Sequence, residues 1–389
     1  MSSEEQWRVA HSPTHSPPPT QRSSFNHTLR MTFGRKWPLI YSSIPNIAQN
    51  PASFSVKLDP IYRSLASFGD ISQNFTDSME GLEALFNALF GSNSHHLEQK
   101  MDESLWWTAL EDAIIDVIFG SNFIEGVGTT REVTAKLCYK VFRGKDVDAE
   151  VLEEVAEGVR WLRERGALIG GTEEEEKAVV IRSRREVVQH AKAFEYMVVA
   201  MVQRDEMLSE RLIKDTHRIL CTGNDLDDAE WTQYAGVYRD GEVSHAVAGQ
   251  KRPHKFITHR AVPRFMKEMI KEYQATIASI ESKGELDPFT LAARFCYYFV
   301  NIHPFWDGNG RLCRLILNTI LLKYAGLVVP IGEDGDEGKE EYLAVCHVSG
   351  QEFLAEGFNA ASPSGHRRFR AFLMGKAGAI VERLCKFLD

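Results

Sequence analysis

Apolar residues recur every three or four positions along most of the chain, a spacing that predicts helices. The strongest such helix opens at Asp102. A second apolar helix, over Pro288–Ile302, leads into a Gly-rich stretch, and a third is expected from about Leu312 to Tyr324. Further helices are predicted over Asp77–Phe90, Val151–Arg165, Arg184–Met201 and Pro363–Leu388, with others beginning after Thr130 and near Leu208, Val262 and Tyr342. The pattern indicates a predominantly helical protein.

Polar segments interrupt this pattern. Residues 1 to about 35 are rich in Ser, Pro, Thr and His, so they bury too little apolar surface to offset the entropy of ordering, and we expect a disordered tail. Residues 37–75 contain more aromatics but frequent prolines, which predicts extended chain and short helices along the body of the protein. The acidic runs Glu173–Glu176 and Gly332–Glu341 are interpreted as solvated loops, and the second has no EF-hand spacing.

Length, charge and cysteine use narrow the class of protein. The 389 residues suggest two or three structural units, and 43% hydrophobic residues suffice for a large core. A net charge of −9 argues against a nucleic-acid binder that relies on a global basic field. Six cysteines occur singly, which favours reduced thiols and a cytoplasmic or nuclear protein. No apolar run is long enough to span a membrane or has the form of a signal peptide, so we expect no membrane association.

The stretch that reads HPFWDGNGRLCR, from His303 to Arg314, holds groups suited to a nucleotide phosphate chain. Gly308 and Gly310 allow the backbone to approach a ligand and to adopt positive φ. Free N–H groups where a loop meets a helix form an anion site, and the guanidinium groups of Arg311 and Arg314 match phosphate oxygens. The stretch therefore predicts a phosphate-binding loop.

Two further side chains of this stretch add chemistry. Asp307 is a candidate Mg²⁺ ligand, because Mg²⁺ binds through one or two carboxylates together with substrate phosphates. His303 can accept a proton near neutral pH and is the candidate general base.

The same stretch resembles the signature of the Fic (Fido) family, HPFx(D/E)GNGRxxR, at every fixed position. The resemblance implies an all-α Fic fold, a helical bundle with a small β-hairpin flap. It also implies transfer of AMP from ATP to a hydroxyl side chain of a target protein. Asp307 would hold Mg²⁺ at the α- and β-phosphates, Asn309 and nearby N–H groups would cradle the phosphates, and Arg311 and Arg314 would take the β- and γ-phosphates. His303 would deprotonate the hydroxyl.

A second motif lies upstream at the end of the helix that opens at Asp102. Ser121 and Glu125 are four residues apart, so on a helix they share a face, and Gly126 would end the turn. The pattern resembles (S/T)xxxE(G/N), the inhibitory helix of Fic proteins. The resemblance implies that Glu125 pairs with Arg314 in the place of the ATP γ-phosphate. Many relatives have Asn where this chain has Val127, a difference that concerns the helix ending.

The resemblance implies two further nucleotide contacts. The flap corresponds to Val243–Lys255, and its part facing the nucleotide would be Ala248, Gly249, Gln250 and Lys251. Tyr342 would lie near the adenine, as in several relatives, but Ser349 replaces the Asn that those relatives have seven residues later. His217, a lone polar residue on the first helix of the core, is interpreted as structural.

The resemblance divides the chain into a tail (1–75), a helical region carrying the inhibitory motif (76–205), a catalytic core (206–378) and a helix end (379–389). Target hydroxyl groups, including its own, are the expected partners, and a homodimer is possible. Alternatives remain open: removal of AMP from a modified target at the same site, or a non-catalytic interaction protein. Phosphorylation is disfavoured because relatives with that activity have Lys in place of Gly310. A metallohydrolase built on His303, Asp307 and His347 lacks a zinc-site spacing.

Overall fold

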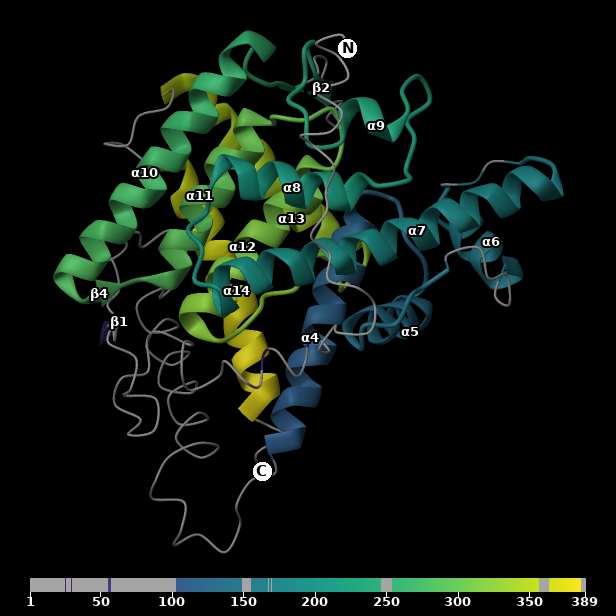
Figure 1. The fold of residues 1–389 in the computed structure, drawn as a ribbon, viewed down its shortest axis with the longest axis horizontal. Coiled ribbons are helices and arrows are strands. Elements are labelled where there is room, and N and C mark those ends of the chain that lie inside the picture. The colour runs from purple at the N-terminus through teal and green to yellow at the C-terminus, as the bar shows by residue number, and fades with distance from the viewer. Residues whose placement is uncertain are drawn as a thin grey trace, which may run out of the picture.

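The computed structural model describes residues 25, 29, 55–56, 103–148, 155–166, 168, 170–245, 254–356 and 364–385, and over these residues it is almost entirely helical (Figure 1). The longer helices are α4 (Glu103–Ile124), α5 (Arg131–Phe142), α6 (Val155–Glu164), α7 (Glu173–Val198), α8 (Glu210–Cys221), α10 (Val262–Lys283), α11 (Pro288–Ile302), α12 (Asn309–Ala325), α13 (Asp336–Glu356) and α14 (Ser364–Cys385). The shorter elements are η5 (Val199–Gln203), α9 (Trp231–Tyr234), η6 (His259–Ala261), β1 (Ser55–Val56), β2 (Ser244–His245), β3 (His254–Lys255) and β4 (Glu285–Leu286). The predicted all-α fold is confirmed.

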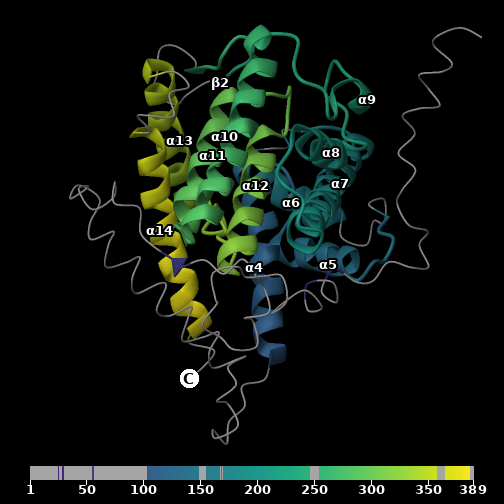
Figure 2. The same ribbon diagram turned by 60° about the vertical axis from the view of Figure 1, so that its left-hand side comes forward.

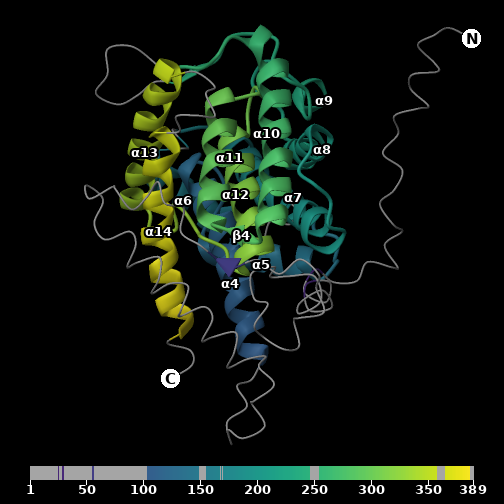
Figure 3. The ribbon, with the colours of Figure 1, turned by 90° about the vertical axis from the view of Figure 1, so that its left-hand side faces the viewer.

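Helix α12 lies at the centre of the molecule, and every one of its residues except Gly310 is buried. Helices α10, α11 and α12 stand side by side between the α13–α14 pair and the α7–α8 pair (Figures 2 and 3). Because α12 begins at the Gly-rich stretch, this arrangement fixes the candidate site against the core.

One apolar core joins the two regions that the sequence separates near residue 206. Side chains of α4, α5 and α7 pack in the same cluster as those of α8 and α10–α14. A small second cluster of Val159, Leu162, Leu168 and Val180 holds α6 against the first half of α7, which projects sideways from the body (Figure 1). The helices before residue 206 are therefore part of the body of the protein.

Both acidic runs were predicted as loops, and the prediction is wrong for Glu173–Glu176 and for residues 336–341, while residues 332–335 do form a turn. The run Glu173–Glu176 forms the first turn of α7. The Thr172 side chain accepts a hydrogen bond from the Glu175 N–H, and the Glu175 carboxylate accepts one from the Thr172 N–H, which makes a capping box. Carboxylates also stabilise the positive end of the helix dipole. Helix α13 likewise begins at Asp336, so Tyr342 lies inside this helix and does not start it.

The predicted disordered tail is wrong for the two residues of it that the structure describes. Phe25 and Leu29 are helical and buried in the main core. The ring of Phe25 lies with its centroid 4.9 Å from that of Phe142 and 6.3 Å from that of Phe194. These two apolar side chains, four residues apart, bury enough surface to be ordered. Beyond them, β1 pairs in parallel with β4, and the helix predicted over Asp77–Phe90 lies outside the described residues.

The described cysteines agree with the reduced thiols that the sequence predicted. Cys138, Cys221, Cys296, Cys313 and Cys346 are free thiols, and all but Cys346 are buried. Within the described part of the chain, each helix is too short or too polar to cross a membrane.

Candidate active site

The Gly-rich stretch forms a short loop between α11 and α12. His303 ends α11 in the left-handed conformation, with φ 50°, and Gly308 has φ 72° just before α12. Helix α12 starts at Asn309, three residues earlier than predicted, with Gly308 as its N-cap. Since no side chain caps this end of α12, its first N–H groups are available to an anion.

The loop is held in shape by its own side chains. The Asn309 amide accepts a hydrogen bond from the Phe305 N–H at 2.9 Å and donates one to the Phe305 carbonyl at 2.8 Å. Asn309 was predicted to help cradle phosphates, but its side chain is bonded to the loop. Only its main-chain N–H is left for that role.

His217 has the structural role that the sequence predicted. Its ring stacks on that of Phe305 with centroids 3.7 Å apart. Its Nδ1 accepts a hydrogen bond from the Gly236 N–H at 2.8 Å, and its Nε2 donates to the Asp307 carbonyl at 2.9 Å. Burial lowers the pKa of His217 to about 4. The ring is therefore neutral and links α8 to the loop.

The His303 imidazole is oriented by two neighbours. It is 7% exposed, and its ring stacks on that of Phe256 with centroids 3.8 Å apart. Its Nδ1 lies 3.3 Å from the Val300 carbonyl oxygen, which favours the tautomer with the proton on Nδ1. That tautomer leaves the lone pair of Nε2 to accept a proton.

Arg311 lies between two carboxylates. Its Nη2 donates to Asp307 Oδ2 at 2.8 Å, and its Nη1 lies 3.9 Å from Oε2 of Glu186, a buried residue of α7. Burial opposes ionisation of Asp307, but the Arg311 guanidinium and the Gly308 N–H lower the pKa of Asp307 below its usual value. Burial raises the pKa of Glu186, although Arg311 acts in the opposite direction. Asp307 is thus an ionised carboxylate at the start of α12.

Arg314, 2% exposed, joins α12 to the end of α4. Its Nε donates to Ser121 Oγ at 2.7 Å, and its Nη2 donates to the Ser121 carbonyl at 3.0 Å and to Glu125 Oε1 at 2.5 Å. The predicted contact between Glu125 and Arg314 is therefore present. Both residues of the upstream motif bind the same guanidinium.

The end of α4 is shaped to deliver this contact. Gly126, with φ 72°, donates its N–H to the Phe123 carbonyl, and Val127 donates to the Asn122 carbonyl, each at 3.1 Å. This pair of hydrogen bonds is a Schellman motif. The end of α4 therefore forms normally although Val127 replaces the Asn of many relatives. A Cβ at Gly120 would lie 2.5 Å from a main-chain oxygen of the turn before α13. Gly120 therefore permits the close approach of α4 to that turn.

Gly310 has a different role from the one predicted. It lies inside α12 without a positive φ, so the expected left-handed conformation is wrong. A Cβ at this position would overlap the Glu125 carboxylate and lie 3.2 Å from Arg314 Nη1. The missing side chain provides the space that Glu125 occupies.

Tyr342 is buried on the other side of Arg314, whose guanidinium carbon lies 5.3 Å from the ring centroid. Ser349, in the place of the family's Asn, donates to the Gly365 carbonyl at 3.2 Å. Tyr342 therefore contacts Arg314 at the site. The contact of Tyr342 with adenine stays a prediction.

The flap is a hairpin at its base. Strands β2 and β3 pair antiparallel, with Ser244 opposite Lys255 and His245 opposite His254. The four residues expected to face the nucleotide lie outside the described residues: Ala248, Gly249, Gln250 and Lys251.

Two buried charged residues of the site were not predicted. Glu186 lies beside Arg311, and Arg239 donates through its Nε to the His303 carbonyl at 2.7 Å. Each is one charged residue among many in the sequence. No local pattern distinguishes them from side chains on the surface.

Comparisons with known proteins agree with this geometry. The sequence model of the Fic/DOC family matches residues 207–321. A Fido domain-containing protein of Dictyostelium discoideum is 36% identical over 103 residues, which are 26% of this chain and 65% of that protein. The protein adenylyltransferase fic-1 of Caenorhabditis elegans is 29% identical over 173 residues, 43% of this chain and 30% of that protein. The chain therefore spans less than two thirds of the length of these curated relatives.

A solved structure shows the same fold. The Fic domain containing signaling protein from Bacteroides thetaiotaomicron has a TM-score of 0.57 and 19% identity, covering 81% of this chain and 96% of that chain. At that identity the likeness concerns the fold alone. Residues 207–321 thus match the Fic/DOC family in sequence, and the described part of the chain matches a protein with a Fic domain in fold.

Proposed function

We propose that this protein is an adenylyltransferase that transfers AMP from ATP to a Ser, Thr or Tyr hydroxyl of target proteins, and that Glu125 restrains it. The observation that carries the proposal is the set of three hydrogen bonds from Arg314 to Ser121 and Glu125 at the start of α12. A guanidinium that holds a carboxylate at a helix N-terminus can also hold a phosphate. The names of the curated adenylyltransferase relatives support the reaction type.

The start of α12 suits a triphosphate. Arg311 and Arg314 are buried on its first turns, one helical turn apart, beside uncapped N–H groups. Arg311 would neutralise the β-phosphate and Arg314 the γ-phosphate. Positioning the phosphates and offsetting the charge that develops on them is most of what phosphoryl-group transfer asks of a protein.

Asp307 fits Mg²⁺ bound together with substrate. Its pKa is lowered, so it is ionised near neutral pH. In the described part of the chain, no three His, Cys, Asp or Glu side chains gather into a metal site. This donor set suits a cation held by one carboxylate and by substrate phosphates. Bound there, Mg²⁺ would supply positive charge to the phosphates.

His303 is the proposed general base. Its Nε2 would take the proton of the target hydroxyl, whose oxygen forms a bond to the α-phosphorus of ATP. The bond from that phosphorus to the bridging oxygen breaks, and diphosphate leaves. A positioned base contributes about 10²- to 10⁴-fold to such a rate.

Restraint would arise from competition for Arg314. While Glu125 accepts from its Nη2, the γ-phosphate cannot take the same position. A signal that moves the end of α4 away would release the guanidinium. In this proposal, residues 76–205 form the regulatory region and 206–378 the catalytic core, while labelling of the protein itself, dimerisation and a cytoplasmic or nuclear location stay predictions.

The test uses Glu125→Ala in purified form and in cell lysate, with ATP labelled on the α-phosphate. Label should appear on protein, increase over wild type, and disappear in the Glu125→Ala/His303→Ala double variant. With the purified protein, ATP labelled on the γ-phosphate should give no labelled protein. Absence of α-label on any protein contradicts the transfer reaction. A decrease in the mass of a premodified target without ATP would show loss of AMP, and would instead favour hydrolytic removal of AMP at this site.

A further inference from the structure

We propose that Arg239 is a positioning residue that fastens the two ends of the flap base, at Gly241 and Ile257, to the carbonyl of His303, so that the flap base and the general base are held as one unit. The inference rests on the adenylyltransferase function proposed above. It concerns a residue that lies between α9 and β2, outside the Gly-rich stretch.

The Arg239 guanidinium donates to three main-chain carbonyls from three separate segments. Nε donates to His303 at 2.7 Å, Nη1 to Gly241 at 2.8 Å, and Nη2 to Ile257 at 2.5 Å. Gly241 precedes β2 and Ile257 follows β3, so these are the points where the hairpin leaves the body of the protein. The main-chain N–H of Arg239 also donates to the Pro304 carbonyl at 2.9 Å.

These bonds are the chief compensation for a buried charge. The Arg239 side chain is 0% exposed, and its nearest carboxylate partner, Glu242, lies 4.0 Å away with 61% of its side chain exposed. Burial lowers the pKa of Arg239, yet a guanidinium does not lose its proton in proteins. A buried charge with little ion pairing destabilises the fold unless hydrogen bonds replace the hydration that it loses. The three hydrogen bonds of the planar Arg239 guanidinium link three segments of the chain.

The bonds also hold a strained residue. His303 has φ 50°, a conformation that a residue with a Cβ keeps only when its surroundings fix it. Its N–H donates to Phe299, its carbonyl accepts from Arg239, and the next carbonyl, of Pro304, accepts from the Arg239 N–H. Arg239 thus sets the direction of two successive carbonyls, and with them the direction of the imidazole.

The flap contributes directly to the orientation of the imidazole. Phe256, which precedes the Ile257 carbonyl bound by Arg239, stacks on the His303 ring. At the other end of the flap, before β2, a Cβ at Gly241 would lie 2.5 Å from the Trp306 ring. Loosening the flap base therefore disturbs both the ring that stacks on His303 and the carbonyl that precedes Pro304.

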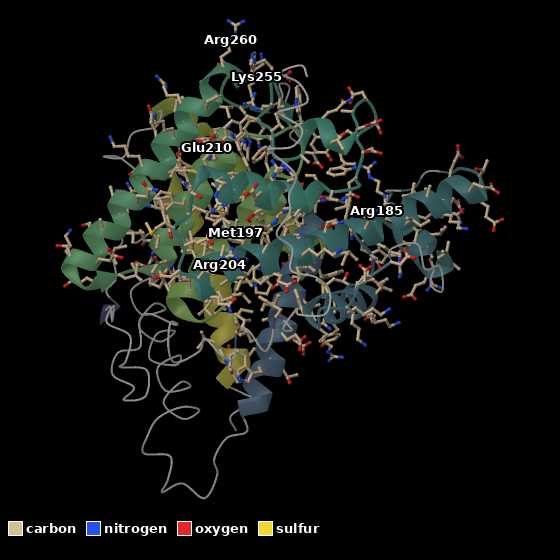
Figure 4. All side chains as sticks on the ribbon, viewed as in Figure 1. Arg185, Met197, Arg204, Glu210, Lys255 and Arg260 are labelled. Atoms are coloured by element: carbon tan, nitrogen blue, oxygen red, sulfur yellow. The ribbon has the colours of Figure 1, made fainter. Side chains whose placement is uncertain are left out.

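The test compares Arg239→Lys with Arg260→Lys, both in the Glu125→Ala background. Lys keeps the charge but has one ammonium group, which cannot satisfy three carbonyls in one plane. Arg260 is the matched control, because it is exposed on η6 near the flap and extends away from the ribbon (Figure 4). Arg239→Lys should lower kcat at least tenfold while KM for ATP stays within twofold, since the phosphate-binding residues are unchanged. Arg260→Lys should leave both constants unchanged.

An unchanged kcat in Arg239→Lys overturns the proposal. A parallel loss of ATP binding also overturns it, because that result indicates a general structural role. Hydrogen exchange in the otherwise wild-type chain gives a readout without activity: Arg239→Lys should speed exchange in peptides covering both 241–245 and 254–258, and Arg260→Lys should not. Unaltered hydrogen exchange in these peptides would show that Arg239 does not fasten the flap base. Absence of labelling in Glu125→Ala alone contradicts the transferase proposal and leaves the exchange result to decide on Arg239.

Discussion

Replacing Gly310 by Ala should destabilise the wild-type chain but stabilise the Glu125→Ala variant. The reversal is expected because a Cβ at position 310 overlaps the Glu125 carboxylate. In the wild type, that carboxylate must retreat and lose its bond to Arg314. In the variant the space is open, and Ala is the better helix former.

The magnitudes follow from the contacts. Ala in place of Gly inside a helix contributes about 0.5–1 kcal/mol. Loss of a charge-assisted hydrogen bond costs about 1.5–3 kcal/mol. The side chain of Glu125 is 35% exposed, so solvent screening places the cost near the lower end of that range. Gly310→Ala should then destabilise the wild type by about 1 kcal/mol. In Glu125→Ala it should be stabilising by about 0.5 kcal/mol, because Arg314 Nη1 at 3.2 Å must shift slightly.

Thermal unfolding of four proteins measures this reversal: wild type, each single variant and the double variant. For a chain of this length, 1 kcal/mol shifts the midpoint by about 1 °C. The coupling energy of the cycle should be about 1.5 kcal/mol. A shift of the same sign and size in both backgrounds would refute the contact between position 310 and Glu125.

Two other predictions concern stability away from this contact. The free energy of unfolding should fall as pH drops from about 6.5 towards 4, because in that window folded His217, with a pKa of about 4, binds fewer protons than an unfolded His. The loss by pH 4 is about 3 kcal/mol, and His217→Gln should flatten the pH dependence of urea unfolding, whereas an unchanged slope rejects this assignment. Thr172→Ala should remove the capping box and weaken the start of α7 by about 1 kcal/mol, seen as faster hydrogen exchange over residues 173–177 with ATP affinity unchanged. Exchange at the wild-type rate would show that the cap is dispensable.

The helices with clear apolar periodicity were predictable from sequence. The structure places α11 at Pro288–Ile302, the predicted range. The acidic run Glu173–Glu176 was not recognised as helical, because composition suggests solvation while the cap at Thr172 and the helix dipole decide the structure. Phe25 and Leu29 were missed for a related reason: a single pair of apolar side chains in a polar segment gives too weak a periodic signal, although both are buried in the core.

The contiguous part of the site was predictable, because the Gly-rich stretch places its groups on one loop and one helix start. The contact between Glu125 and Arg314 joins residues far apart in sequence and was expected only through the family resemblance. Glu186 and Arg239 could not be predicted, because burial of a charged side chain depends on helices packed against it from elsewhere in the chain. The role of Gly310 likewise depends on α4, which fills the space above it.

The proposed restraint depends on competition between Glu125 and a nucleotide phosphate for Arg314. Calorimetric titration with ATP and Mg²⁺ tests it directly, comparing His303→Ala with His303→Ala/Glu125→Ala so that no turnover occurs. A charge-assisted bond of about 1.5–3 kcal/mol corresponds to about 10- to 100-fold in affinity. ATP should bind more tightly by that factor when Glu125 is removed, and equal affinity in the two proteins would show that Glu125 and the phosphate do not compete.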